Sequence, residues 1–457
     1  MPNTEHKKIT KKFSSGFRWS ICGSIIYELS KILHQTFLLK TMESSLYGLM
    51  GSIFSIIYLI IYLTDFGLCY SLPTFLNIFT KNKNNFKKIF IKIYLLPQIL
   101  IITLSAFCAT YFYSKSFLQN TKSPFIYLIP LIIIFESIRI FFRRFFHNVF
   151  MSRITVITET ILMILYLTTV WIPYLFLNFR MTTNLIFMPY LLNSIVCVII
   201  FIFLLIRYHN NLPQEPLIYP ANLLKKILKI RFFNYSIHVS KNFFTGNFLT
   251  PFFAAKFGLS IAGVFNLANH IAESIKAIMT TTIIFSGNAM IANLKSATMK
   301  IKREAFKLLF QKLNIVIYPI AIFLLINYKN LIALKGYHSV SQATLSLAVL
   351  FLFISLSEYF FLIYEQFYII QEHSGKLFLL KLFEFTLFYG IILSNSLYSP
   401  FATLLIIMLI KIVSFSLISI TAYSIWKIKP NFSINKTYLI SYFVISILFF
   451  YYLNKLC

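Results

Sequence analysis

The chain has 457 residues, of which 58% are hydrophobic, 18% are aromatic and only 12% are charged, and its formal net charge at pH 7 is +29. A soluble fold cannot bury this much apolar surface, and apolar patches left exposed to water drive association. The composition therefore excludes a soluble domain and predicts an integral membrane protein.

Apolar stretches of about 20 residues, the length of a membrane-spanning helix, recur along the whole chain. We expect spans at 17–39, 46–72, 88–113, 124–147, 153–178, 184–207, 230–257, 261–286, 308–333, 343–370, 376–396, 400–426 and 436–455. The longest loops between them lie near 208–230 and 287–307. The sequence therefore predicts an all-α integral membrane protein with about 12–13 transmembrane helices and no separate extramembrane domain.

Basic residues gather in alternate breaks between the spans. They include HKKITKK at 6–12, KNKNNFKK at 81–88 and KKILKIR at 225–231. Because cytoplasmic loops carry the excess of Lys and Arg in membrane proteins, this pattern places the N-terminus in the cytoplasm. Anionic lipid headgroups are then the partners of most of this charge, and we expect no nucleic acid as a partner.

The chain also contains a weak internal repeat. The segment at 40–56, KTMESSLYGLMGSIFSI, aligns with the segment at 255–271, AKFGLSIAGVFNLANHI. In this alignment Gly48 corresponds to Gly263. Six spans per half return the chain to the cytoplasm, so the halves have parallel topology. We expect a six-helix lobe at 1–207, a cytoplasmic linker at 208–230, a second six-helix lobe at 231–426 and an extra C-terminal helix at 427–457.

The sequence motifs of several enzyme classes are absent. The chain has no GxxxxGK[ST] loop for nucleotide phosphates, no HExxH zinc motif and no GxSxG nucleophile elbow. The five cysteines show no CxxC pair and lie mostly in apolar spans, as is typical of small buried hydrophobic residues. We therefore expect a protein that is not an enzyme and that needs neither a cofactor nor a metal.

Charged residues inside the spans are the candidates for function, because an ionised side chain in hydrocarbon is costly. In the fourth span Glu136, Arg139, Arg143 and His147 fall on one face of the helix. Glu136 and Arg139 fit either an i,i+3 ion pair or a role facing a polar cavity. Arg143 and Arg144 lie near the inner end of the span, where arginine side chains usually reach lipid headgroups.

Polar residues recur in other spans, and the first and seventh spans hold equivalent positions in the two proposed halves. The first, seventh and eighth spans contribute Glu28, Lys31, His34, His238, Lys241, Asn266, Asn269, His270 and Glu273. Further acids within spans are Asp65, Glu358, Glu365 and Glu384. Asp65, in LTDFG, fits a helix-terminus contact near the inner surface as well as a functional role.

Bases outnumber acids in these spans, which predicts a cationic cavity. Such a cavity attracts phosphate or pyrophosphate, which arginine can bind in a bidentate manner. A cavity for cationic drugs would instead need acidic and aromatic walls. The cations that we expect to line the cavity are Arg139, Arg143, Lys31, Lys241 and His270.

Four short motifs carry a family resemblance. They are the Gly16–Trp19 start, LYG at 46–48, DFG at 65–67 running into SLP, and FESIRIFFRR at 135–144. In these residues the chain resembles bacterial polysaccharide (O-antigen type) flippases, which belong to the multidrug/oligosaccharidyl-lipid/polysaccharide (MOP) exporter superfamily. The motifs fall in roughly the first third of the chain, whereas the layout of the spans agrees over most of its length.

This resemblance implies a MATE-like fold of two six-helix lobes around a central cavity that opens alternately to each side of the membrane. It implies that the cargo is an oligosaccharide on undecaprenyl pyrophosphate, with the pyrophosphate held by the cationic lining. It also implies coupling to a proton or sodium gradient, for which the candidate residues are Glu136, Glu28, Asp65 and Glu273.

We therefore expect a flippase of the bacterial inner membrane that serves polysaccharide, O-antigen and lipopolysaccharide biosynthesis. Its expected partners are lipid-linked oligosaccharide, membrane lipids and the polymerase and glycosyltransferases of the pathway. Two alternatives stay open. One is a cation-coupled multidrug exporter of the same superfamily, and the other is an integral-membrane polymerase or ligase, which would need essential residues on a large outer loop.

Overall fold

A computed structural model of the chain describes residues 44–117, 128–149, 151–177, 181–217, 222–242, 244–258, 373–393 and 399–427 without interruption. It also describes single residues and short stretches between 19 and 42, 261 and 269, 299 and 310, and 364 and 369. The predicted spans at 308–333 and 436–455 lie almost entirely outside these residues. So do most of 261–286 and 343–370 and nearly all of the predicted extra helix at 427–457.

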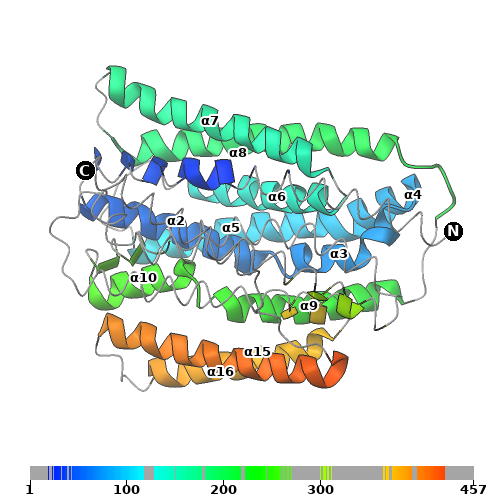
Figure 1. Cartoon of the computed structure of the whole chain (residues 1–457). Helices are drawn as coiled ribbons and strands as arrows, with labels where there is room; N and C mark the ends of the chain where they lie inside the picture. The colour runs from blue at the N-terminus through cyan, green and yellow to red at the C-terminus, as the bar shows by residue number, and fades with distance from the viewer. Residues whose placement is uncertain are drawn as a thin grey trace, which may run out of the picture. The chain divides into compact units, whose positions relative to one another are not determined.

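Every regular element among the described residues is helical, which confirms the predicted all-α class (Figure 1). In chain order these elements are α2 (Ser44–Thr64), α3 (Leu68–Phe79), α4 (Lys83–Asn85), the π-helix η1 (Phe86–Leu95), α5 (Leu96–Phe117), α6 (Leu128–Asn148), α7 (Ser152–Leu177), α8 (Thr183–Asn210), α9 (Leu223–Asn242), α10 (Gly246–Phe257), α15 (Ser374–Leu393) and α16 (Pro400–Trp426).

The chain forms two compact units, and each is described by itself. Unit 1 comprises Met1–Ser52 and Leu249–Cys457, and unit 2 comprises Ile53–Phe248. The predicted division into lobes at 1–207 and 231–426, with a linker and an extra helix, stays a prediction. In unit 2, α6 packs against α5, α7 and α8, while α3 packs against α6, α9 and η1; in unit 1, α15 packs against α16.

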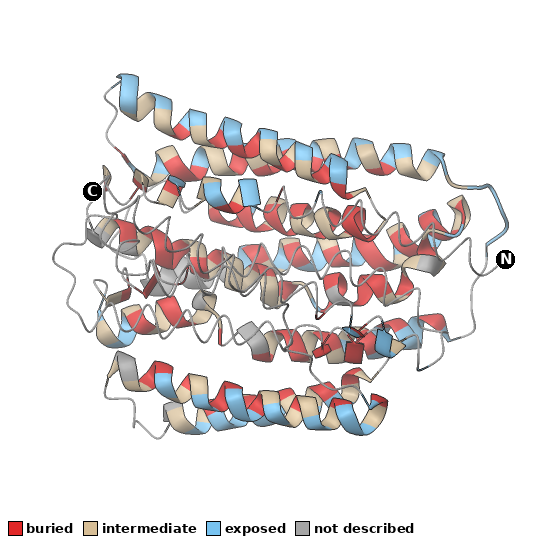
Figure 2. Cartoon of the chain, viewed as in Figure 1, coloured by how far each residue is buried: buried red, intermediate tan, exposed pale blue. Residues whose placement is uncertain are grey.

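Within the described residues, four helical stretches are long and apolar enough to cross a bilayer. They are Lys83–Cys108, Ser152–Leu177, Thr183–Asn210 and Ala402–Trp426. Large apolar side chains stay exposed along α7 and α8, among them Phe176 and Phe203 (Figure 2). An exposed apolar surface of this kind suits contact with lipid tails and not with water. The chain is an integral membrane protein, as predicted.

The predicted span 46–72 is not one helix, and this expectation is corrected. α2 ends at Thr64 and α3 begins at Leu68, because Phe66 and Gly67 adopt left-handed backbone angles with φ of 44° and 71°. Glycine adopts this conformation without a steric penalty. A side chain at position 67 would also collide with the backbone of Arg231 on α9, so the break is a point of close helix packing.

Where a membrane helix is interrupted, some backbone carbonyl oxygens lose their hydrogen-bond donors within the helix. Other groups of the protein must then donate to them. Here the side-chain amide of Gln98 donates to the carbonyl oxygen of Thr64. The Nε of Arg231 donates to the carbonyl oxygen of Phe66 at 3.2 Å, and the hydroxyl of Tyr94 donates to that of Leu68 at 2.6 Å. Three side chains from α5, α9 and η1 therefore stabilise the interruption between α2 and α3.

The predicted span 230–257 is also divided. α9 runs over Leu223–Asn242 and α10 over Gly246–Phe257, so α9 begins inside the segment predicted as a linker. The segment that follows α8 is held by two hydrogen bonds to the polar segment around α4, which precedes η1. Asn82 Nδ2 donates to the carbonyl oxygen of Pro216 at 3.1 Å, and Asn84 Nδ2 donates to that of Glu215 at 2.6 Å.

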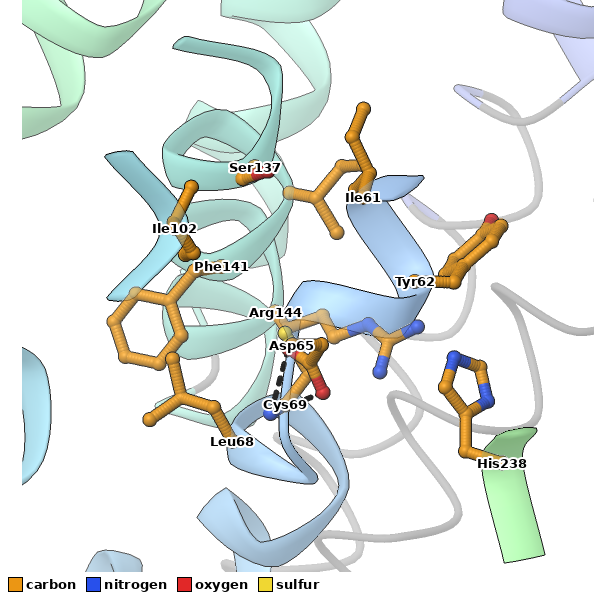
Figure 3. A pocket seen from close by; sticks show the side chains of 11 residues that line it. Ile61, Tyr62, Asp65, Leu68, Cys69, Ile102, Ser137, Phe141, Arg144 and His238 are labelled. Atoms are coloured by element: carbon orange, nitrogen blue, oxygen red, sulfur yellow. Dashed lines mark hydrogen bonds between the residues drawn. The ribbon is translucent and has the colours of Figure 1, made fainter. Parts of the chain in front are cut away.

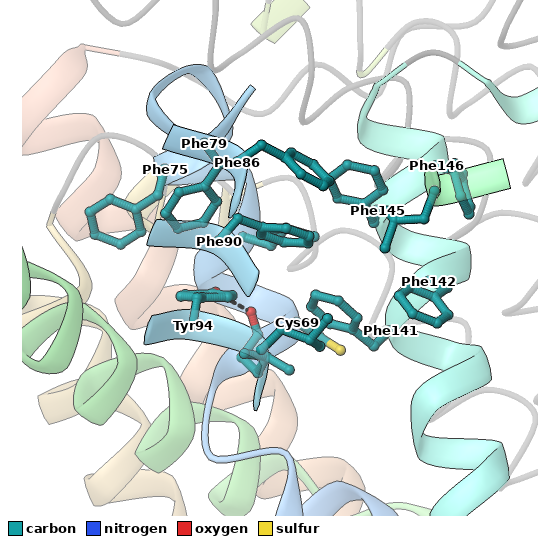
Figure 4. Packing of buried hydrophobic residues seen from close by; sticks show 14 of the residues in the cluster. Cys69, Phe75, Phe79, Phe86, Phe90, Tyr94, Phe141, Phe142, Phe145 and Phe146 are labelled. Atoms are coloured by element: carbon teal, nitrogen blue, oxygen red, sulfur yellow. Dashed lines mark hydrogen bonds between the residues drawn. The ribbon is translucent and has the colours of Figure 1, made fainter. Parts of the chain in front are cut away.

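An aromatic core fixes α6 in unit 2. Phe79, Phe86 and Phe90 pack with Phe145 of α6, and the ring centroids of Phe90 and Phe145 lie 5.0 Å apart (Figure 4). The opposite side of η1 exposes lysines, which suits a helix that enters the membrane from a charged surface. This packing holds the helix that carries the charged residues predicted to be functional.

Candidate functional site

The first element of the candidate site is a buried ion pair on α6. Arg139 Nε donates to Glu136 Oε2 at 2.8 Å, and Arg139 Nη2 donates to Glu136 Oε1. The side chains are 7% and 1% exposed. Of the two arrangements that the sequence left open for these residues, the i,i+3 ion pair is present, and its bidentate geometry is the strong form of such a contact.

A second acid, Glu159 of α7, completes this cluster. Glu159 Oε2 lies 3.0 Å from Arg143 Nε, and Glu159 Oε1 lies 3.8 Å from Arg139 Nη1. Sequence reasoning missed Glu159, because a lone glutamate in TVITETIL gives no sign of its partner on another helix. We call Glu136, Arg139, Arg143 and Glu159 the α6–α7 quartet; it holds two acids and two bases.

Hydroxyl groups from α2 and α8 complete the surroundings of Glu136. Ser194 Oγ donates to Glu136 Oε2 at 3.0 Å, and the hydroxyl of Tyr58 donates to Glu136 Oε1 at 3.3 Å. The hydroxyls of Tyr58 and Tyr190 lie 2.6 Å apart. Each carboxylate oxygen of Glu136 therefore accepts from Arg139 and from one hydroxyl.

A second cluster of the same composition lies in unit 1. Lys381 Nζ lies 2.7 Å from Glu384 Oε2 and 3.2 Å from Glu365 Oε1, and Lys411 Nζ lies 2.9 Å from Glu384 Oε1. Ser414 Oγ donates to Glu384 at 2.7 Å. The four charged side chains are at most 3% exposed. We call Glu365, Lys381, Glu384 and Lys411 the α15–α16 quartet.

The two quartets share their chemistry although they lie in different units. Each combines two glutamates with two bases, and in each a serine, Ser194 of α8 or Ser414 of α16, donates to a glutamate. Buried charges persist only when they are paired, because an unpaired charge in a low-dielectric interior is strongly destabilising. The charged interior that the structure describes is thus balanced within each unit.

Asp65 belongs to neither quartet and lies in the break between α2 and α3. Its two carboxylate oxygens each lie 3.3 Å from the backbone nitrogen of Cys69, so it caps α3 weakly. It lines a small pocket with Arg144 of α6 and with Tyr62 and His238 (Figure 3). The helix-terminus contact considered for Asp65 is present. Arg144, expected at the lipid headgroups, faces this pocket instead.

The remaining predicted residues are placed as follows. Glu28 and Lys31 form an i,i+3 ion pair in unit 1, with 3.1 Å between Lys31 Nζ and Glu28 Oε2. Lys31 is the more accessible partner, with 33% of its side chain exposed. Lys241 lies at the C-terminal end of α9, while His270 and Glu273 lie outside the described residues. In the part of the chain that is described, no group of three His, Cys, Asp or Glu residues could hold a metal.

By sequence, no protein-family model and no curated protein matches the chain. By structure, it is similar over nearly its whole length to transporters of the MATE fold. The eukaryotic MATE transporter AtDTX14 aligns with a TM-score of 0.63 and 12% identity over 96% of this chain and 99% of its own. An outward-facing MATE family multidrug resistance transporter of the MOP superfamily aligns with a TM-score of 0.61 and 11% identity, over 98% of this chain and 97% of its own.

A third similar structure is a MOP superfamily transporter from Pyrococcus furiosus, for which a reverse polarity of the binding pocket suggests a different function. It aligns with a TM-score of 0.55 and 11% identity, over 92% of this chain and 96% of its own. These likenesses show that the chain has the MATE fold, which confirms the predicted fold class. The identities are too low to transfer an activity.

Proposed function

We propose that the chain is a flippase that transfers oligosaccharide linked to undecaprenyl pyrophosphate across the bacterial inner membrane. The MATE fold supports a transporter built from membrane helices. The motifs near the N-terminus and FESIRIFFRR favour the polysaccharide branch of the superfamily over the drug-exporting branch. The orientation with a cytoplasmic N-terminus, and partnership with the polymerase and glycosyltransferases of the pathway, belong to the same proposal.

The observation that carries this proposal is the neutralisation of the acids inside the spans. Among the described residues, Glu28, Glu136, Glu159, Glu365 and Glu384 each lie within ion-pair distance of a lysine or arginine. A pocket for a cationic drug needs acidic groups that are not already paired. Acids that are already paired leave little to hold a cationic cargo, which favours an anionic cargo such as a pyrophosphate.

The exposure of the predicted cations suggests an order of contact with the cargo. Lys31 and Arg143 have 33% and 21% of their side chains exposed, whereas Arg139 has 7%. We infer that Arg143 meets the pyrophosphate directly and that Arg139 acts through the geometry of its quartet, while Lys31 stays a proposed binding residue of unit 1. Lys241 and His270 stay in the proposed set of binding residues.

A cation-coupled multidrug exporter is the second candidate, because one of the similar structures is described as a multidrug resistance transporter. The two candidates make opposite predictions for cells that lack the gene. Loss of the flippase leaves the pyrophosphate-linked glycolipid facing the cytoplasm and stops surface glycan export, with drug susceptibility unchanged. Loss of a drug exporter raises drug susceptibility and leaves the glycan intact.

Complementation of such cells tests the residues. We expect Arg143→Lys to restore export more fully than Arg143→Ala, because lysine keeps a charge near the cargo and near Glu159. Arg153→Ala is the matched control, since Arg153 is an exposed arginine of α7 that belongs to neither quartet. Normal export by a Lys31→Ala, Arg143→Ala double variant would contradict the proposed binding role.

A further inference from the structure

One face of α2 carries three aromatic side chains at helical spacing. Phe54, Tyr58 and Tyr62 follow one another at intervals of four residues, so they form a stripe along the helix. Tyr190 of α8 packs beside them, with its ring centroid 5.3 Å from that of Phe54 and its hydroxyl 2.6 Å from that of Tyr58. We call these four residues the α2–α8 aromatic stripe, and all of them belong to unit 2.

The stripe differs both from the aromatic core and from a surface for lipid tails. Its four side chains are half-buried and lie outside the core cluster, whereas Phe86 and Phe90 of the aromatic core are fully buried. Among the described residues of α2 no side chain is fully exposed, while α7 and α8 expose many large apolar side chains. A lipid-facing helix would expose such side chains, so the stripe does not have the pattern of a lipid-facing surface.

Polar contacts hold the tyrosines of the stripe in place. The hydroxyl of Tyr58 donates to Glu136 of the α6–α7 quartet at 3.3 Å. The ring of Tyr62 stands edge-on to the ring of His238, with 5.2 Å between the centroids, and both residues line the pocket that contains Arg144 (Figure 3). Because these contacts orient the rings before any ligand arrives, less freedom is lost on binding.

An aromatic face with polar groups at its edge fits a sugar ring. The C–H face of a pyranose is apolar and packs flat against an aromatic ring, while the sugar hydroxyls bond to polar groups around it. Asn193 of α8, three residues after Tyr190, offers such a group, because its Oδ1 is buried and no described residue donates to it. A buried acceptor without a donor is costly, and a sugar hydroxyl would supply the donor.

We propose that the α2–α8 aromatic stripe binds the sugar rings of the cargo. This inference rests on the proposed flippase function and names the residues that hold the carbohydrate part of the cargo. Tyr58 contacts Glu136, and Arg143, proposed to meet the pyrophosphate, pairs with Glu159 of the same quartet. The stripe thus adjoins the quartet that includes the pyrophosphate ligand, as a cargo requires whose first sugar is bonded to its pyrophosphate.

The charges beside the stripe favour a sugar over an organic cation. Aromatic faces attract cations, but a site for a cationic drug also needs a carboxylate that is not already paired. Glu136, which contacts the stripe, is bound by Arg139, and Asp65 shares its pocket with Arg144. A neutral ring that brings its own hydroxyl groups needs no such carboxylate.

The test measures binding to the purified full-length chain in detergent by isothermal titration calorimetry. The probes are farnesyl pyrophosphate and the same lipid carrying a disaccharide of N-acetylglucosamine on its pyrophosphate. Tyr62→Leu keeps an apolar side chain but removes the flat ring, so we expect binding of the glycosylated probe to weaken by about fivefold. Binding of the sugar-free probe should stay within about twofold of that of the unchanged chain.

Three further variants complete this test. Tyr62→Phe keeps the ring and should bind the glycosylated probe within about twofold of the unchanged chain. Phe54→Leu should repeat the selective loss at the other end of the stripe, and it decides the proposal if Tyr62→Leu fails to fold. Tyr111→Leu, at an exposed tyrosine of α5, is the matched control and should bind both probes as the unchanged chain does.

The outcomes separate the sugar site from the proposed function. Equal losses for both probes, or unchanged binding of the glycosylated probe by Tyr62→Leu and Phe54→Leu, overturn the sugar site and leave the flippase standing. Binding of tetraphenylphosphonium that is lost in Tyr62→Leu, while binding of the glycosylated probe is unchanged, overturns the sugar site and favours the drug exporter. If the unchanged chain binds neither pyrophosphate probe, the proposed function fails, and the sugar site fails with it.

Discussion

The α6–α7 quartet makes a quantitative prediction for Arg139→Met. Methionine keeps much of the length of the arginine side chain and removes the groups that bind Glu136. The guanidinium makes two charged hydrogen bonds to Glu136 and lies 3.8 Å from Glu159, in a site where its side chain is 7% exposed. Removing one partner of a buried ion pair costs about 3–5 kcal/mol, whereas an exposed pair is worth at most about 1 kcal/mol.

The contacts that Glu136 and Glu159 keep after the substitution place the expected loss of unfolding free energy near the lower end of about 3–5 kcal/mol. Ser194 and Tyr58 still donate to Glu136 after the substitution, and Arg143 still pairs with Glu159. We therefore expect Arg139→Met to lower the free energy of unfolding by about 3 kcal/mol. The double variant Glu136→Gln, Arg139→Met removes both charges and keeps an oxygen that accepts from the hydroxyls, so its loss should fall to about 1 kcal/mol.

Denaturant titration of the purified chain in detergent micelles, followed by tryptophan fluorescence, measures both values. Arg153→Met, at an exposed arginine of α7 outside the quartet, is the control and should change little. A loss below about 1 kcal/mol for Arg139→Met would show that the pair behaves like an exposed one. A double variant that is as unstable as the single one would show that the charge left on Glu136 is not the cause.

Three further substitutions test the rest of the structure by the same titration. Lys411→Met leaves one oxygen of the buried Glu384 without its cation and should cost about 3 kcal/mol, less if Lys381 compensates. Gly67→Ala places a side chain at φ of 71° against the backbone of α9 and should cost at least about 1 kcal/mol, whereas Gly390→Ala, with open space around it, should cost less. Phe90→Ala removes a fully buried ring from the aromatic core and should cost about 3–5 kcal/mol; a loss equal to that of an exposed phenylalanine would contradict this packing.

The helical class could be predicted from the sequence because it depends on local composition. Runs of apolar residues long enough to span a bilayer have no alternative but to form helices there. The two interruptions, after Thr64 and after Asn242, were harder to see, since each falls inside a stretch long enough to be one span. The first had a signal in the DFG sequence, where glycine allows the left-handed turn and aspartate caps the next helix.

The α6–α7 quartet could be predicted only in part. Glu136 and Arg139 are three residues apart on one helix, and this spacing alone indicates an ion pair. Glu159 pairs across to another helix, and no local pattern shows which helices will pack together. Lys381 and Glu384 have the same spacing as the first pair, so this spacing indicates half of the second quartet as well.

The most direct test of the proposed function is a reconstitution experiment. Purified chain is placed in vesicles with a fluorescent pyrophosphate-linked glycolipid, and its appearance in the opposite leaflet is followed by quenching from outside. We predict faster transfer than in protein-free vesicles, and slower transfer for the Lys31→Ala, Arg143→Ala variant. Transfer no faster than in protein-free vesicles, together with uptake of a cationic dye by the same preparation, would contradict the flippase and favour the drug exporter.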